Sequence, residues 1–393
     1  MRGLVDASDV SAPLPHAGHE LIGAIDRARL LGRGGAGFPV GAKWRAVAER
    51  SKGDAVVLVN GAEGEPHSKK DRLLMTARPH LVLDGAFLAA RVLRARRIVL
   101  YIGERHEQAR TSMLHALAQR TERDRELVTV MAAPARYVAG AEAAAIHFVN
   151  EGVATPTTTP PYPFERGVGG APTLVQNVET LAHVAQIARG EFGNSALITL
   201  SGDVARQGVV EVTLGTTIGA AVNWAGGVKE KPRAVLVGGY FGTWLTPRQA
   251  AMVTLSSDDL KAMGAGLGCG AIAVLTGDTC PVAELARVTR WLAGQSAGQC
   301  GACAHGLPAI AGAVEHMANG SDRDASAEAA ARRWLDMVVG RGACKLPDGA
   351  VRFVSSGFTV FAEHIAEHRA CGRCPALDAP AVLPVPRPEE SWR

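Results

Sequence analysis

The sequence predicts an α/β protein in three parts: a domain with a parallel sheet, a small β-rich domain and a C-terminal helical bundle. In the first part, apolar runs of strand length alternate with helical segments, which is the rhythm of a parallel sheet with right-handed crossovers. Short apolar runs between glycine turns begin at about residue 195, and helical periodicity dominates from about residue 281. These changes set the predicted domains at 1–192, 193–276 and 277–375, followed by a proline-rich tail at 376–393.

The elements of the first domain follow an arm at residues 1–19, which we expect to be irregular. Apolar runs bounded by turn residues predict the strands, and a spacing of three to four residues between apolar positions predicts the helices. The strands are AVVLVNG (55–61), RRIVLYI (96–102) and ELVTVMAA (126–133). The helices are expected at 20–31, 80–95, 104–119 and 176–189.

The remaining segments complete the prediction. The stretch 153–172 is too rich in proline and glycine for regular structure, and a loop of this length in a compact domain is usually functional. The tail is expected to be disordered or draped over the surface. Strands are expected at 196–202, 208–214 and 233–239, and helices at 282–294, 327–340 and 358–368.

Composition narrows the functional classes. The chain has 393 residues, with 47% hydrophobic and 20% charged residues and a net charge of +4 spread along it. No basic run points to nucleic acid. No apolar stretch is long enough to span a bilayer, and the N-terminus lacks the apolar core of a signal peptide, so we expect a cytoplasmic protein. In a reducing compartment, the seven cysteines are better candidates for metal or redox chemistry than for disulfides.

The glycine-rich run GRGGAGFPVGAKW at 32–44 is the first candidate site. Its clustered glycines let backbone amides approach a ligand closely and adopt positive φ. Arg33 and Lys43 add positive charge, which suits a phosphate-bearing cofactor. The run matches neither the dinucleotide fingerprint nor a P-loop, and a tight structural turn is the alternative.

Polar residues in three further segments extend this site. Glu63 and Glu65 follow a predicted buried strand, where ligands bind in open α/β sheets, and their carboxylates suit sugar hydroxyls; a solvated acidic loop is the alternative. Asn177 and Thr180 lie one turn apart, where they would cap a helix and hold a phosphate at its start. The third segment is YVAGAEAAAIHF at 137–148.

In this order, the four segments resemble the NADH-binding flavoprotein subunit of respiratory complex I and its soluble dehydrogenase and hydrogenase relatives. That family carries GRGGAGFPxGxKW, then NxDExEP, YxxGEE, and PPxP followed by NNVETL. The resemblance covers about residues 20–375. It implies a Rossmann-like parallel sheet domain, a small β-grasp domain of the SLBB type, and a helical domain that carries an iron–sulfur site.

The resemblance also implies the ligands of each cofactor. Phe38 and Tyr162 would lie against the flat rings of NADH, and Glu65 and Glu142 would stand beside them as the candidate catalytic residues, with Glu142 shaping the electrostatics near the reacting ring. The residues implied to cradle FMN are Gly32, Arg33, Gly34, Gly35, Ala36, Gly37, Lys43, Asn60, Glu63, Tyr137, Gly140, Asn177 and Thr180.

Four positions depart from the family pattern in this region. Ala62 replaces the first acidic residue, Ala141 the first of a glutamate pair, and Ala46 an aromatic residue; Gln176 replaces an asparagine. Each lost hydrogen bond costs about 1 kcal/mol, so we expect weakened rather than abolished cofactor binding.

The cysteines imply a [4Fe–4S] cluster with an altered ligand set. The family motif SCGxCxxC reads SAGQCGAC here, so Ala297 stands at the first ligand position, while Cys300, Cys303 and the distant Cys344 are retained. Three interpretations remain: a substitute fourth ligand, a cluster on three cysteines, or a lost cluster.

The substitute ligand would come from Cys371, Cys374 or His305, and we take Cys371. The spacing Cys371-x-x-Cys374 alone is also compatible with a zinc site or a redox pair. Cys269 and Cys280 lie in apolar or turn contexts and are expected to be structural.

The function that the resemblance implies is an oxidoreductase: hydride transfer from NADH to FMN, then one-electron transfer through the cluster to a ferredoxin-like or thioredoxin-like [2Fe–2S] subunit of a larger complex. Two alternatives stay open. The chain is a scaffold or electron-relay paralogue that has lost NADH oxidation, or a flavoprotein that uses a ferredoxin donor.

Overall fold

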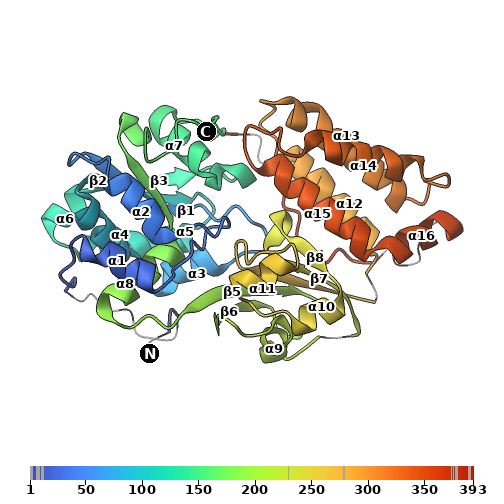
Figure 1. Ribbon diagram of the computed structural model, residues 1–393, viewed down its shortest axis with the longest axis horizontal. Coiled ribbons are helices and arrows are strands. Elements are labelled where there is room, and N and C mark those ends of the chain that lie inside the picture. Colours follow the sequence, from blue (N-terminus) through green and yellow to red (C-terminus); the bar gives the residue numbers. More distant parts are fainter. Residues whose placement is uncertain are drawn as a thin grey trace.

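The first sheet is parallel and has the strand order β3–β2–β1–β4. Figure 1 shows the computed structural model, which describes residues 3–5, 9, 13–228, 230–277, 279–372, 374, 376, 379–387 and 391–393. The strands are β1 (Ala55–Gly61), β2 (Ala95–Gly103), β3 (Val128–Ala133) and β4 (Thr173–Asn177). The predicted strands at 55–61, 96–102 and 126–133 are confirmed, whereas β4 was missed because its short run TLVQN leads directly into a helix.

Alternating side chains of β1 serve two separate cores. Val57 and Val59 pack on the face covered by helices α1, α2, α4, α5 and α8, while Val56 and Leu58 pack on the face covered by α7. The bounds of the helices are α1 Glu20–Arg27, α2 Val40–Ala48, α3 Lys70–Ala77, α4 Pro79–Leu93, α5 Glu107–Ala118, α6 Glu122–Glu126, α7 Glu142–Glu151 and α8 Val178–Arg189.

The loop predicted at 153–172 is irregular except for a single short turn at its end, η2 (Val168–Gly170). The predicted arm at 1–19 lies partly outside the described residues. In its described part, Leu4 is buried in the core of the sheet domain and the carbonyl of Gly3 accepts a hydrogen bond from Arg78 Nη1 at 2.9 Å.

The second sheet is mixed, with the strand order β6–β5–β9–β7–β8. Strands β5 (Ser195–Gly202), β6 (Gly208–Thr213) and β7 (Pro232–Val237) confirm the three predicted strands. Strands β8 (Thr243–Leu245) and β9 (Ala271–Thr276) were not predicted, and β9 pairs in parallel with β5 and antiparallel with β7. Helices α9 (Ile218–Trp224), α10 (Pro247–Met252) and α11 (Ser257–Ala262) accompany this sheet.

The C-terminal part is helical, and Figure 1 shows it beside the two sheet domains. Its helices are α12 (Pro281–Gly294), α13 (Leu307–Ala318), α14 (Ser326–Val338), α15 (Leu346–Val360) and α16 (Ala362–Cys371). The helix predicted at 358–368 is divided, because α15 ends before Phe361 and α16 begins after it. None of the described helices combines the length and the apolar character that a bilayer crossing requires.

The described residues of the tail are draped over the protein. Glu284 accepts hydrogen bonds from the amides of Val382 and Leu383, and Leu383 is buried. Trp291 Nε1 donates to the carbonyl of Pro386 at 2.7 Å. The tail then reaches the first domain, where the carbonyl of Trp392 accepts from the amide of Ala154 at 2.8 Å.

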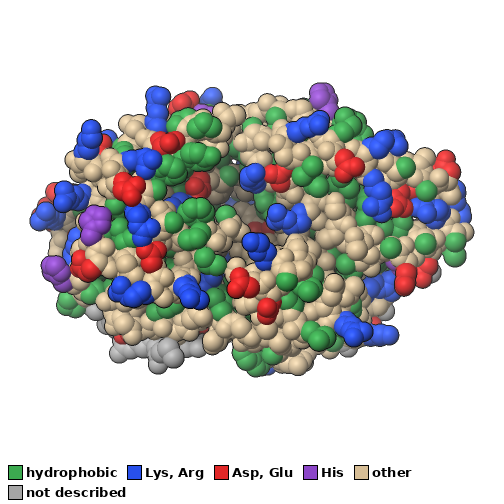
Figure 2. All heavy atoms as spheres, in the orientation of Figure 1, with side chains coloured by type: hydrophobic (Ala, Val, Ile, Leu, Met, Phe, Trp, Pro, Cys, Tyr) green, Lys and Arg blue, Asp and Glu red, His purple; other side chains and the backbone are tan. Residues whose placement is uncertain are grey.

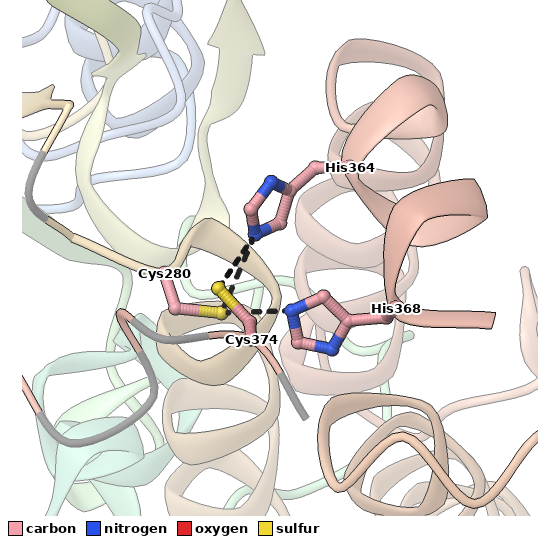
Figure 3. A group of neighbouring side chains, drawn as sticks. All are labelled: Cys280, His364, His368 and Cys374. Carbon is pink, nitrogen blue, oxygen red and sulfur yellow. Dashed lines mark hydrogen bonds between the residues drawn. The ribbon is translucent and has the colours of Figure 1, made fainter. Parts of the chain in front are cut away.

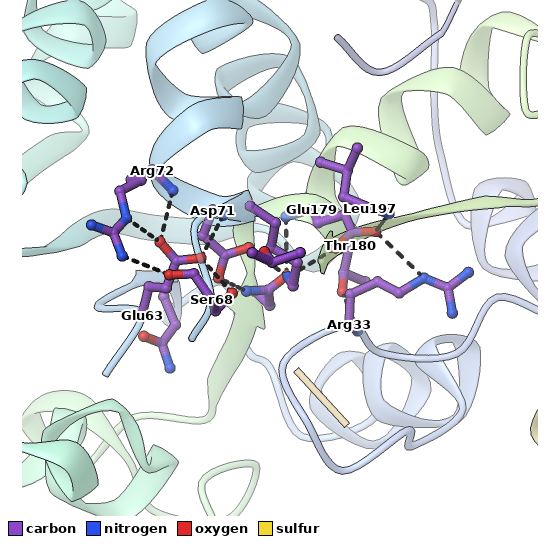
Figure 4. Close-up of polar contacts among 12 residues, drawn as sticks. Arg33, Glu63, Ser68, Asp71, Arg72, Glu179, Thr180 and Leu197 are labelled. Atoms are coloured by element: carbon purple, nitrogen blue, oxygen red, sulfur yellow. Dashed lines mark hydrogen bonds and ion pairs between the residues drawn. The ribbon is translucent and has the colours of Figure 1, made fainter. Parts of the chain in front are cut away.

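A buried network of charges joins the first domain to the second (Figure 4). Lys70 Nζ on α3 lies 2.6 Å from Asp71 Oδ1 and 2.8 Å from Glu179 Oε2 on α8. Glu179 Oε1 accepts from the amide of Leu197 in β5 at 2.8 Å and lies 3.8 Å from Arg33 Nε. Burial alone would raise the pKa of Glu179, but Lys70, His183 and Arg33 together outweigh burial and hold that pKa at about 2. Glu179 is therefore ionised and compensated.

Replacing Glu179 with glutamine should destabilise the fold strongly, because Lys70 and Arg33 lose their compensating charge in a buried site. Breaking such a network costs about 3–5 kcal/mol of unfolding free energy, measurable by urea denaturation. Glu315→Gln is the matched control, because it breaks an exposed pair with Arg290 and should cost about 1 kcal/mol or less. Equal costs for the two variants would contradict the role given to the buried network.

Candidate functional site

The glycine-rich loop is an open hairpin at the protein surface. Leu31 bridges to Pro39, and the amide of Gly32 donates to the carbonyl of Phe38 at 2.9 Å, which closes the base of the loop. Residues 34–39 are exposed. Gly35 has a φ of 118° and Gly37 a φ of 61°, and a Cβ on either would meet no atom within 4 Å. The loop is not occluded by side chains.

The amides at the tip of this loop are available to a ligand. Residues 33–36 form a turn, and in the part of the chain that the structure describes the amides of residues 34–37 make no backbone hydrogen bond of ordinary length and angle. Successive amides in such a turn form a concave donor site for anions. Because only glycine adopts the φ of Gly35 and Gly37 without strain, the sequence keeps this backbone bare.

The loop lies against the start of helix α8. Asn177 caps this helix, since its Oδ1 accepts from the amide of Glu179 at 3.0 Å, which confirms the predicted helix start. A Cβ on Gly34 would lie 3.2 Å from Asn177 Cβ, and Thr180 Oγ1 accepts from the amide of Arg33 at 2.9 Å. The positive end of the α8 dipole therefore adds to the loop amides.

Arg33 differs from expectation. Its side chain is buried and turns away from the loop tip: Nη2 donates to the carbonyl of Ser195 at 3.0 Å, and Nε faces Glu179 (Figure 4). The guanidinium is therefore committed to the buried network and does not supply charge to a phosphate. Arg33 instead anchors the loop from below.

Lys43 and Glu142 meet although they lie far apart in the sequence. Lys43 Nζ pairs with Glu142 Oε1, and Glu142 remains half exposed at the start of α7. Helix α2, which carries Lys43, begins directly after the loop. The structure thus brings together a cation expected on the FMN side and a carboxylate expected on the NADH side.

Asn60 and Gly140 also meet, at the end of strand β1. Asn60 Nδ2 donates to the carbonyl of Gly140 at 2.8 Å, and Asn60 Oδ1 accepts from the amide of Ala62 at 3.3 Å. Ala62 is buried, and a Cβ on Gly140 would lie 3.6 Å from its methyl group. This part of the site is closely packed and apolar where the family pattern has a carboxylate.

Glu63 follows β1, and groups of the protein itself occupy both of its carboxylate oxygens. Glu63 Oε1 accepts from Ser68 Oγ at 2.7 Å and from the amide of Asp71 at 2.8 Å, while Oε2 pairs with Arg72 Nε at 3.1 Å (Figure 4). The carboxylate therefore caps the start of α3 instead of facing a cofactor hydroxyl. Glu63 also has a φ of 41°, which turns the chain at this point.

Glu65 is buried where the three domains meet. Its Oε2 accepts from the hydroxyl of Tyr137 and the amide of Tyr240, each at 2.9 Å. Tyr137 in turn packs edge-on against Phe241 at 4.8 Å and Trp291 at 5.3 Å. Tyr137 and Glu65 thus hold the domain junction together, and neither faces the open loop. Burial raises the pKa of Glu65 to about 7.

The aromatic residues expected to face NADH lie at the surface. Phe38 ends the glycine-rich loop and is 56% exposed, and Tyr162 is 47% exposed. Tyr162 stacks on Phe164 with ring centroids 5.4 Å apart and planes within 6°. One face of each ring system is available for a flat ligand.

Cys300, Cys303 and Cys344 gather between α12 and the start of α15. Cys300 precedes the turn η4 (Ala302–Gly306) that contains Cys303, and Cys344 precedes α15. The Cys303 thiol interacts with Cys300, Cys344 and the hydroxyl of Ser296. Burial would raise the pKa of Cys300, but amide donors from Ala343, Cys303 and Ala302 outweigh it and lower that pKa. These amides favour the thiolate form of Cys300, which is the form that binds iron, whereas burial raises the pKa of Cys303 and Cys344.

Cys371 is not brought to this group. It is exposed at the end of α16, three residues before Cys374, and Cys374 belongs to a different cluster of side chains at the start of α12. Cys300 follows the other end of α12, and a helix of 14 residues is about 21 Å long. Sequence spacing could not show that α12 separates the two groups.

Replacing Glu65 with glutamine should remove one source of pH dependence in stability. With a pKa of about 7 when folded and 4.5 when unfolded, Glu65 keeps its proton in the folded state across that range. The contribution of Glu65 to the free energy of unfolding is complete below about pH 4.5 and is lost as the pH rises through 7. Relative to Glu65→Gln, the wild type should lose on the order of 3 kcal/mol of unfolding free energy over this range. Urea unfolding at both ends of this range, with the exposed Glu126→Gln as control, tests this; parallel curves for wild type and Glu65→Gln would refute it.

Comparison with protein families accounts for the three parts of the chain. Residues 25–186 match the Nuo51 FMN-binding domain, residues 197–239 the SLBB domain, and residues 283–368 the NADH-ubiquinone oxidoreductase-F iron-sulfur binding region. The matches follow the order predicted from the sequence, and the fold class is confirmed.

Comparison with individual proteins gives the same result over nearly the whole chain. It is 28% identical to the F subunit of the Escherichia coli NADH-quinone oxidoreductase, over 88% of this chain and 83% of that protein. The crystal structure of an NAD+-reducing [NiFe]-hydrogenase in the H2-reduced state superposes with a TM-score of 0.82 and 29% identity, covering 94% of this chain and 66% of that chain. With 30% identity to the F subunit of the Mycobacterium tuberculosis NADH-quinone oxidoreductase, over 91% of this chain and 86% of that protein, the chain belongs to the family of NADH-quinone oxidoreductase F subunits.

Proposed function

We propose that this chain is the electron-entry flavoprotein subunit of a larger oxidoreductase complex, which oxidises NADH at FMN and passes electrons through a [4Fe–4S] cluster to an iron–sulfur partner. One observation carries the proposal: the amides of residues 34–37 are exposed, bare and placed over the start of α8. Bound FMN would convert the two-electron chemistry of a hydride into single-electron steps.

The loop and α8 would hold the FMN phosphate. Backbone amides and a helix N-terminus bind a phosphate without a dedicated arginine, which fits the burial of the Arg33 side chain. Lys43 stands at the start of α2 beside this loop and would add the nearby positive charge. Asn60 and Gly140, already hydrogen-bonded to each other, would form the packed floor below the ring.

Phe38, Tyr162 and Glu142 would form the NADH side of the site. The two exposed rings offer flat apolar faces to nicotinamide or adenine. Glu142 is held by Lys43, so its carboxylate is positioned before a nucleotide arrives. Figure 2 shows Lys and Arg side chains around a hollow in the middle of the viewed face, between the first domain and the helices, which suits the negative charge of a dinucleotide.

Cys300, Cys303 and Cys344 would hold the cluster through three thiolates. Ala297 stands at the first ligand position of the family motif and its side chain cannot bind iron, while its neighbour Ser296 places a hydroxyl beside Cys303. The partner would be a ferredoxin-like or thioredoxin-like [2Fe–2S] subunit, in a complex that works in the cytoplasm or against a membrane. A scaffold that has lost NADH oxidation is the second candidate, because Ala62 and Ala297 both replace functional groups of the family.

Replacing Gly37 with alanine should weaken FMN binding by about tenfold or more, because the new methyl group enters the open space that the ligand would occupy. The dissociation constant is measured by quenching of flavin fluorescence on titration of the apoprotein. Gly152→Ala is the matched control, since Gly152 has a similar positive φ of 74° and equally open surroundings at the end of α7. Both variants should lose about 1 kcal/mol of stability; equal FMN affinities for the two would argue against the loop as the cradle.

Anaerobically purified protein should show a flavin spectrum that bleaches when NADH is added. Cys300→Ala should keep the flavin bleaching while losing iron and sulfide, because the cluster lies outside the flavin cradle. The measurements are visible absorbance and iron–sulfide analysis. A colourless protein that takes up no added FMN would support the scaffold, and flavin that responds to reduced ferredoxin but not to NADH would support the ferredoxin-linked alternative.

A further inference from the structure

Four metal-binding side chains gather at the start of helix α12, outside the flavin and iron–sulfur sites (Figure 3). Cys280 is the residue that caps α12, His364 and His368 lie one turn apart on α16, and Cys374 follows α16. One ligand atom of each lies within 4.8 Å of the ligand atoms of the other three. The sequence indicated a structural role for Cys280, and it offered Cys374 only as a cluster ligand or as the partner of Cys371.

The distances match a tetrahedral metal site. Cys280 Sγ lies 3.4 Å from His368 Nε2 and 3.7 Å from His364 Nε2, and Cys374 Sγ lies 3.5 Å from His364 Nε2. With Zn–S bonds near 2.3 Å and Zn–N bonds near 2.1 Å, a tetrahedral ion separates sulfur from nitrogen by about 3.6 Å. Figure 3 shows the two thiols and both Nε2 atoms facing a common centre. Three of the six distances among the ligand atoms are therefore close to the tetrahedral value, and the other three are no longer than 4.8 Å.

The groups around His364 favour the neutral tautomer with the proton on Nδ1, which leaves Nε2 free to bind a metal ion. Its Nδ1 lies 3.0 Å from Glu367 Oε2, so a proton on Nδ1 is donated to a carboxylate and Nε2 is left bare. Arg233 Nη1 also approaches Nδ1 at 3.0 Å, while its Nη2 donates to the carbonyl of Gly277 at 3.0 Å. When His364 Nδ1 is protonated and donates to Glu367, Arg233 still has a hydrogen-bond acceptor in the carbonyl of Gly277.

This cluster is distinct from the iron–sulfur ligands. Cys280 precedes α12 and Cys300 lies beyond its other end, and the 14-residue helix between them is about 21 Å long. Two thiols and two imidazoles within one mononuclear coordination sphere are typical of a structural zinc site, whereas cubane clusters in proteins are usually held by thiolates that stand further apart.

We propose that Cys280, His364, His368 and Cys374 bind one structural Zn²⁺ ion. Four protein ligands close the coordination sphere, so the ion has no open position for a substrate. The ion would tie the segment after α16 to the start of α12, at the point where the chain continues into the draped tail. The rival is a disulfide between Cys280 and Cys374, although both are free thiols in the structure.

The test measures zinc and iron together in the anaerobically purified full-length chain. Plasma mass spectrometry should find about one zinc per chain in addition to cluster iron. Cys374→Ser and His368→Gln should each lose most of the zinc and keep the iron and flavin. Cys300→Ala should show the opposite pattern. Cys371→Ser is the matched control: this exposed thiol is three residues from Cys374 but outside the cluster, so its zinc content should not change.

A second measurement covers the case in which a ligand variant fails to fold. Wild-type protein stripped with a chelator and given Co²⁺ should develop the absorption of tetrahedral thiolate-bound cobalt, and Zn²⁺ should displace it. The proposal is overturned if the wild-type protein contains no zinc as purified and also binds no Co²⁺. It is also overturned by iron in place of zinc at this site, by a Cys280–Cys374 disulfide found by thiol titration, or by unchanged zinc in folded Cys374→Ser.

Discussion

A buried carboxylate, Glu179, fixes the geometry on which the flavin cradle depends. Taking an ionised group out of water is costly unless opposite charges and hydrogen bonds surround it, so Lys70, Arg33 and the amide of Leu197 must converge on it. Their convergence places the glycine-rich loop over α8 and joins the second domain to the first. Because Arg33 is held from below, the glycine amides that follow it are left facing solvent.

Where this chain departs from its family, the structure replaces polar groups with packing. Ala62 fills the space beside Gly140 with a methyl group, and Ala141 puts a methyl group where the family pattern has the carboxylate next to Glu142. Cofactor binding would therefore depend more on backbone amides than on side chains. Any sequence with glycines at these positions supplies those amides. This explains how the family's loop persists here while several of its carboxylates do not.

The sequence predicted what local patterns determine and missed what distant contacts determine. The bounds of β1, the cap at Asn177 and the order of the three domains follow from short-range periodicity and motifs. The role of Glu65 depends on Tyr240, which is 175 residues away. A local signal for the zinc ligands was nonetheless present: His364 and His368 are four residues apart on one helix face, with Cys374 shortly after. Only their meeting with Cys280 required the structure.

Helix α12 connects the proposed zinc site, the domain junction and the cluster. Cys280 caps its start, and just beyond its end Gln295 Oε1 accepts from the amide of Tyr137 at 2.9 Å, five residues before Cys300. Tyr137 belongs to the same short turn, η1 (Tyr137–Gly140), whose last residue is bonded to Asn60 at the flavin cradle. The cluster loop is thereby anchored through a few bonded residues to the floor of the cradle. A zinc ion at the start of α12 would fix the other end of the helix. The flavin cradle and the cluster would then keep a constant separation.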